Sequence, residues 1–116
     1  MRITRKGMKA AKDLQKTYPS IDINKLAEIC SILVMEANAL DRINEQECNT
    51  GITDATEQQS ARHMAYVREV VKENLPDTSV RFQGDPRGLS IYLITPDQRF
   101  NTLGGAESGY GIVNVD

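Results

Sequence analysis

The sequence is poor in the residues from which most metal and disulfide sites are built. It has one histidine, two cysteines and no tryptophan in 116 residues. Cys30 and Cys48 fall 18 positions apart on what the pattern predicts as one helix, or about 27 Å along its axis. A disulfide requires Cα atoms within about 7 Å, and the ligands of a zinc ion must meet at one point. We therefore expect free thiols, no metal site and no cofactor.

Long apolar runs are absent as well. No run approaches the roughly 18 apolar residues of a membrane-spanning helix, so we expect no membrane contact. The basic residues near the N-terminus are not followed by an apolar stretch, which argues against a secretory signal. Free thiols and the missing signal together predict a cytoplasmic protein. An apolar fraction of 40% and a charged fraction of 26% are typical of one globular domain, here residues 1–116.

A strong net charge is also missing, but the charge is unevenly distributed. The formal net charge is −2, which argues against a dedicated nucleic-acid-binding domain. Residues 1–21 have six basic residues and one acid, whereas residues 22–58 have eight acids and two basic residues. One interpretation is that the basic segment packs along the acidic one and neutralises it. The other is that Lys9, Lys12 and Lys16 form a binding surface for phosphates or for an acidic protein.

The first 76 residues have the pattern of a helical layer. Residues 4–17 carry apolar side chains at helical spacing, and Pro19 ends this helix. Residues 23–47 form a longer helix that contains neither glycine nor proline, and Ser20 or Asp22 caps it. Its length of about 36 Å exceeds the needs of so small a domain. One end therefore projects, or residues 23–47 pack against a second copy in a homodimer.

A third helix follows the break at Asn49-Thr50-Gly51. Thr53 or Asp54 begins it, and Asp54 with Glu57 has the spacing of a capping box. Pro76 closes the helix. Its predicted buried face consists of Ala61, Met64, Val67, Val71 and Leu75.

Beyond Thr78 the apolar period changes from helical to alternating. Val80 and Phe82 alternate with polar residues, and the pattern resumes from Leu89 after a turn. Residues 99–103 fit a strand or a loop, and residues 110–115 fit a last strand. The predicted fold is α+β, with three helices packed on one face of a small antiparallel sheet formed by residues 77–116.

The turn between the two alternating runs is a candidate contact site. Asp85 can bond the turn backbone, Pro86 has the fixed φ of a type I turn, and Gly88 tolerates positive φ. The turn does not require Arg87, whose side chain stands at the tip. A purely structural turn explains the other residues, and recognition led by Asp85 and Arg87 is the functional alternative. A phosphate-binding loop is not indicated, because the glycines lead into a strand and no Lys-Ser/Thr follows.

Cys48, His63 and Asn49 are the residue types of a thiol-dependent active site. Asn49 directly follows Cys48, however, and is therefore poorly placed to orient the histidine. We interpret Cys48 as a small apolar residue that ends a buried stripe, and His63 as a helix-surface residue. A cysteine-dependent enzyme is the last-ranked reading, and we expect no catalytic residues.

The order of these motifs resembles a set of small phage- and prophage-encoded proteins of unknown function. In that set a helix ends in Cys-Asn, here Cys48-Asn49, and a second helix follows. A Gly-Asp-Pro-Arg-Gly hairpin comes next, here residues 84–88, and then a closing strand that contains Gly111-Ile112-Val113. The resemblance covers residues 40–115. It implies an accessory protein of a phage or mobile element that acts in the cytoplasm of a bacterial host.

These observations lead to one expected function and one alternative. We expect a non-enzymatic protein that binds and modulates a host protein complex, such as a defence or nucleic-acid-processing system. Its contact surfaces would be Asp85 and Arg87 at the hairpin tip, and Lys9, Lys12 and Lys16 on the first helix. The alternative is a small nucleic-acid-associated protein that uses the same basic helix.

Overall fold

The computed structural model describes residues 2–85 and 88–96 of the chain. Three helices precede a β-hairpin within these residues. The elements are α1 (Arg5–Leu14), α2 (Ile23–Thr50), α3 (Asp54–Asn74), β1 (Ser79–Asp85) and β2 (Gly88–Ile94). The two strands pair antiparallel, which confirms the expected α+β class. The strand or loop expected from residues 99–103 and the last strand expected from residues 110–115 lie outside the described residues.

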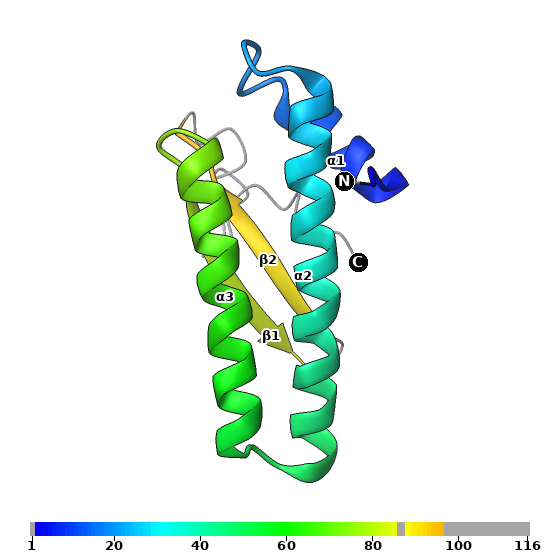
Figure 1. Ribbon diagram of the computed structural model, residues 1–116, viewed down its shortest axis with the longest axis vertical. Coiled ribbons are helices and arrows are strands. Elements are labelled where there is room, and N and C mark those ends of the chain that lie inside the picture. The colour runs from blue at the N-terminus through cyan, green and yellow to red at the C-terminus, as the bar shows by residue number, and fades with distance from the viewer. Residues whose placement is uncertain (1, 86–87, 97–116) are drawn as a thin grey trace.

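The two long helices form one layer and the hairpin forms the other. Figure 1 shows α2 and α3 side by side and antiparallel, with the two strands crossing behind them. α2 contacts β2, and α3 contacts β1. α1 packs on α2 at the end where α2 begins, on the side away from α3. The layer over the sheet is therefore built mainly from α2 and α3, and α1 lies outside it.

The core lies between this helical layer and the hairpin. α2 supplies its largest share, because the apolar stripe predicted for this helix is buried from Leu26 to Leu40. α3 adds Val67 and Val71, whereas Ala61, which was expected on the buried face, is exposed. The reason is the position of α3 along α2. Only the second half of α3 lies over the core cluster, and its first half follows the projecting end of α2.

The alternation predicted for the hairpin is confirmed in its register. Leu89, Ile91 and Leu93 are buried on the helix-facing side, and Ile91 and Leu93 pair with Phe82 and Val80 of β1. Directly opposed residues of an antiparallel pair share one face of the sheet. The apolar face thus runs across both strands. The pairing ends at Asp85 with Gly88, as expected for a tight connection between the strands.

The helix boundaries differ from the expected ones by a few residues. α1 ends at Leu14 and not at residue 17, because the chain then turns through Thr17, whose amide bonds the Leu14 carbonyl. α2 begins after Asp22, which caps it through Oδ2, and continues to Thr50. It stops at Gly51, whose φ of 89° is strained for other residues.

The cap of α3 uses a different pair of residues from the expected one. Thr53 is the N-cap, and its hydroxyl accepts a hydrogen bond from the Thr56 amide at 3.2 Å. The Thr53 amide in turn bonds the Thr56 hydroxyl at 3.0 Å. The box of Asp54 with Glu57 is therefore wrong by one position. Thr56 is buried, and its hydroxyl also donates to Glu47 of α2 at 2.8 Å, which ties the two helix ends together.

Candidate functional site

α1 is held on α2 by a close contact between small residues. Its buried residues are Gly7, Ala10, Ala11 and Leu14. A Cβ atom added to Gly7 would lie 2.1 Å from Ser31 Oγ, so the two backbones approach too closely for any larger side chain. Ser31 is fully buried in α2, and its Oγ accepts from the Thr4 amide at 3.0 Å and donates to the Ala27 carbonyl at 2.7 Å. Thr4 in turn caps α1 through the Gly7 amide. The start of α1 is thereby fixed in position.

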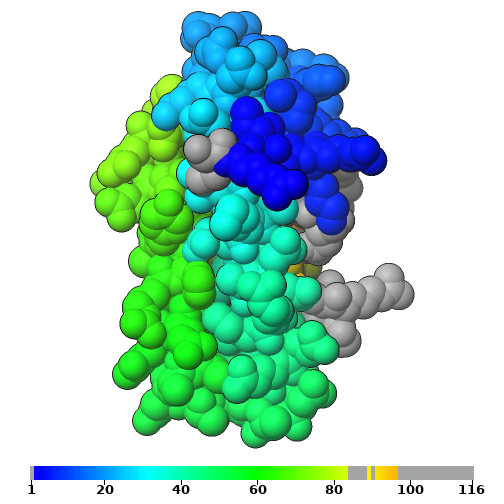
Figure 2. Space-filling model, turned by 45° about the vertical axis from the view of Figure 1, so that its right-hand side comes forward, coloured from blue at the N-terminus to red at the C-terminus, as the bar shows by residue number. Residues whose placement is uncertain are grey.

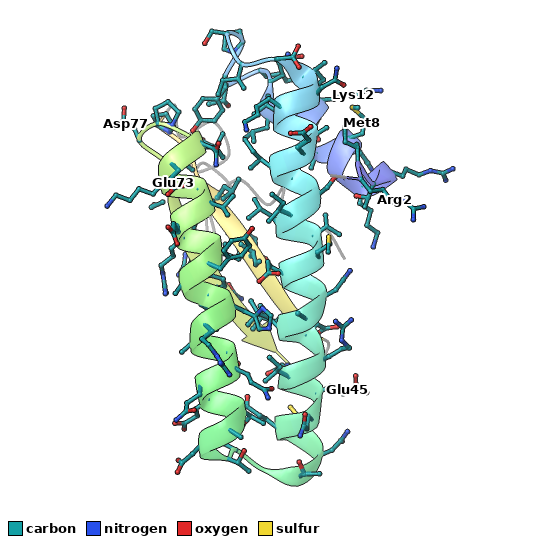
Figure 3. The ribbon with its side chains drawn as sticks, viewed as in Figure 1. Arg2, Met8, Lys12, Glu45, Glu73 and Asp77 are labelled. Atoms are coloured by element: carbon teal, nitrogen blue, oxygen red, sulfur yellow. The ribbon has the colours of Figure 1, made fainter. Side chains whose placement is uncertain are left out.

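This docking leaves the cations of α1, and Arg2 before it, on the outside of the molecule. Five of them are exposed and make no ion pair, hydrogen bond or ring contact in the part of the chain that the structure describes. We call these residues the basic surface: Arg2, Arg5, Lys6, Lys9 and Lys12. Figure 3 shows Arg2 and Lys12 on the outer side of α1. Lys16, the third lysine expected there, is exposed too but lies 3.8 Å from Asp13 Oδ1 in a solvated pair.

The basic surface does not neutralise the acids of α2, contrary to one of the two interpretations of the charge pattern. α1 contacts α2 near Ser31, whereas most acids of α2 lie further along the helix. Three of these acids have partners elsewhere in the fold. Glu36 bonds His63, Asp41 bonds the backbone of β2, and Glu47 bonds Thr56. Glu45, a fourth, is exposed well below α1 in Figure 3.

The start of β2 is held on α2 by an unexpected contact. Asp41 Oδ1 accepts a hydrogen bond from the Leu89 amide at 3.0 Å. Helical spacing does not predict a partner for Asp41 on another element, so this role was missed. Asp85 is the last residue of β1, and its side chain, like all of Arg87, lies outside the described residues. The structure therefore fixes the strands that carry the tip and leaves the tip contact itself a prediction.

Cys48 and His63 do not form one site. His63 Nδ1 lies 2.7 Å from Glu36 Oε1, so the ring sits between α3 and α2. Glu36 and Cys48 are 12 residues apart on α2, which is about 18 Å along the helix. Cys48 is exposed, so its interpretation as part of a buried stripe is wrong. The helix stripe leaves the core after Leu40, because the end of the α2–α3 pair extends beyond the strands.

Cys30 differs from Cys48 in burial, which governs the access of a reagent to a thiol. It is buried in the core, and this burial raises the pKa of its thiol to about 12. The thiolate is the reactive form of cysteine, and it is nearly absent here at neutral pH. The two thiols lie on the continuous helix α2, as predicted, and are both free.

Several contacts that shape the site could not be found by sequence spacing. Residues 27 positions apart meet at Glu36 with His63 and at Thr4 with Ser31, and residues 60 apart meet where the Tyr18 hydroxyl bonds the Thr78 hydroxyl. Periodicity places a residue on a face but does not choose its partner on another element. Within the described residues, no group of three or more His, Cys, Asp or Glu side chains is arranged to hold a metal ion. None of the described helices has the length and apolar character to cross a membrane.

Comparisons of the chain with models of protein families, with curated proteins and with solved structures give no significant match.

Proposed function

We propose that this chain is a non-enzymatic accessory protein of a phage or mobile element that binds a host protein complex in the bacterial cytoplasm. The complex would belong to a defence or nucleic-acid-processing system. The observation that supports binding is the basic surface, whose five cations are exposed, close together and unpaired within the described residues. The phage or prophage context rests on the order of motifs in residues 40–115.

The partner surface that fits this site is acidic. Charged groups on an exposed helix face steer association and discriminate between partners, more than they contribute raw affinity. The close contact of Gly7 with Ser31 sets the position of α1, and with it the positions from which the cations extend, relative to α2. Asp85 and Arg87 at the hairpin tip are the second proposed contact, because the turn itself does not need an arginine.

The test is affinity capture from a bacterial host with two matched charge reversals. Lys9→Glu with Lys12→Glu reverses the basic surface, and Arg62→Glu with Lys72→Glu makes the same charge change on the exposed face of α3. Lys12 and Lys72 are each in the last turn of their helix, so the two variants carry a similar helix-dipole cost. We expect the first variant to lose a partner that the second retains. Equal capture by both would contradict a contact at α1.

A nucleic acid is the second candidate, favoured by the density of cations on one short helix. A contact with several phosphates would make the affinity fall steeply with salt, with a slope of about −0.9 per phosphate for duplex DNA. Base stacking by Tyr18 is not available, because its ring is buried and its hydroxyl bonds Thr78. Fluorescence anisotropy with a short labelled duplex and a single strand separates the candidates. Salt-dependent binding that Lys9→Glu with Lys12→Glu removes would favour nucleic acid over a protein partner.

A further inference from the structure

α2 has a second, narrow face that lies beside its core stripe and runs along its outer side. Its residues recur at steps of four, three, four and three positions, which is the spacing of a helix-packing seam. They are Glu28, Ile32, Met35, Ala39 and Arg42. The core stripe of α2, from Leu26 to Leu40, faces α3 and the hairpin. Figure 2 shows the surface of α2 open below α1.

The middle of this seam is apolar and uncovered. Met35 is 55% exposed, which makes it one of the few large apolar side chains of the described residues in that state. Ile32, which packs partly against the core cluster, and Ala39 are half-buried. An exposed apolar residue between half-buried neighbours fits the centre of a contact between proteins.

The two ends of the seam carry opposite charges at equal distances from Met35. Glu28 lies seven residues before it and Arg42 seven residues after it, and seven residues are close to two helical turns. Within the described part of the chain, neither side chain has an ion pair or a hydrogen bond. If a second α2 lies antiparallel to the first, the acid at one end of each seam is therefore opposite the base at the other end of its partner.

We propose that two copies of this chain associate through antiparallel packing of their α2 helices, about a two-fold axis that passes beside Met35. Met35 then meets Met35 of the second copy, and Ile32 lies near Ala39. Each Glu28 faces Arg42 of the other copy, so the same pair forms twice, as a two-fold interface requires. A parallel arrangement would place Glu28 beside Glu28 and Arg42 beside Arg42, and like charges in contact are repulsive.

Charge complementarity is what favours a second copy over an unrelated partner on this seam. An unrelated helix would need its own charges to match an acid and a base that stand 14 residues apart, whereas a reversed α2 supplies them by symmetry. The seam is short, and its apolar centre is small. The association is therefore expected to be weak, as for other contacts of limited area.

A charge-swap series tests the proposal by sedimentation equilibrium over a range of concentrations. Arg42→Glu alone and Glu28→Arg alone place like charges together and are expected to weaken the dimer about tenfold or more. The double variant restores the opposite pairs and should return the dissociation constant to within a few-fold of the original. Glu57→Arg, an equal charge change at an exposed position of α3, is the control and should leave it unchanged. A monomer at all concentrations, or a double variant as weak as the singles, would overturn the proposal.

Crosslinking locates the axis independently of the charges. In a Cys48→Ser background, Met35→Cys should give covalent dimers with a short bis-maleimide, since the two sulfur atoms would face each other. Tyr66→Cys, at an exposed position of α3, is the control. Equal crosslinking at the two positions would contradict the seam. The dimer does not rest on the proposed function. Lys9→Glu with Lys12→Glu should therefore leave the dissociation constant of the dimer unchanged.

Discussion

At the scale of single residues, the contact of Gly7 with Ser31 decides how α1 lies on α2. An alanine at position 7 would bring its Cβ within 2.1 Å of Ser31 Oγ and 2.9 Å of the Ser31 backbone nitrogen. The hydroxyl can rotate away, but the backbone of α2 cannot. The glycine is needed for this close approach and not for a special backbone angle.

Gly7→Ala is therefore expected to destabilise the protein by about 1–3 kcal/mol, the range for overpacking in a closely packed site. Urea unfolding measures the loss. Lys6→Ala, at the exposed neighbouring position, should change the free energy of unfolding by no more than about 0.5 kcal/mol. If Gly7→Ala were as stable as wild type, α1 could not be docked on α2 at this distance.

The two thiols should react very differently with an alkylating reagent at pH 8. Cys48 is exposed and should be modified in the native protein, whereas Cys30 is buried with a pKa of about 12. Cys30 should react only after denaturation. Mass spectrometry should show one modified thiol in the native state and two in urea. Two rapidly modified thiols in the native protein would mean that the core around α2 is open.

The raised pKa of Cys30 also has a consequence for stability. The unfolded thiol ionises near pH 9, and the folded one near pH 12. The stability that depends on a neutral Cys30 is fully present below pH 9 and is lost as the pH rises from about 9 towards 12.

At the scale of elements, the hydrogen bond from Leu89 to Asp41 joins the hairpin to α2. A two-stranded hairpin alone is marginally stable in water, so its position depends on such contacts and on the burial of Leu89, Ile91 and Leu93. Asp41→Ala would leave the Leu89 amide without its acceptor. Asp41→Asn keeps an oxygen in the same place.

We expect Asp41→Ala to lower the free energy of unfolding by about 1–3 kcal/mol and to speed hydrogen exchange at the Leu89 amide. Asp41→Asn should retain most of the protection, and Glu45→Ala, one turn further along α2, should have no effect. Unchanged exchange at Leu89 in the alanine variant would show that the hairpin is held by its apolar face alone.

The elements themselves could largely be predicted from the sequence. The apolar stripe of α2 lacks glycine and proline and so has no break, and the change to alternating residues after Thr78 marks the strands. The local rule failed at the cap of α3, where the Thr53 and Thr56 hydroxyls satisfy each other's amides and an acidic box was expected. A threonine hydroxyl can both donate and accept a hydrogen bond, so the residue types alone do not show which pair of residues forms the capping box.

The same reasoning from the sequence predicts only part of the candidate site. Exposure of Lys9 and Lys12 follows from helical spacing, because the apolar residues of α1 fix the opposite face. Whether these cations neutralise α2 does not follow, because the answer depends on where α1 lies along α2. That position is set by the fit of Gly7 against Ser31, a close approach that no periodic pattern encodes.

At the scale of the whole molecule, the charges are separated by the way the helices are stacked. α1 lies at the end where α2 begins (Figure 1), and three acids of α2, Glu36, Asp41 and Glu47, bond α3 or β2 further along its length. The basic surface is therefore not needed by the fold. The separation leaves these cations available to a partner, whereas a surface that stabilised the fold would have a purely structural explanation.

The most direct test is the free energy of unfolding of Lys9→Glu with Lys12→Glu, measured in urea against Arg62→Glu with Lys72→Glu. We predict that the two variants differ by less than about 0.5 kcal/mol, as expected for exposed charges that pair with nothing in the folded chain. A variant of α1 less stable than its control by about 2 kcal/mol or more would show that the cations serve the fold, and would contradict their assignment to a partner.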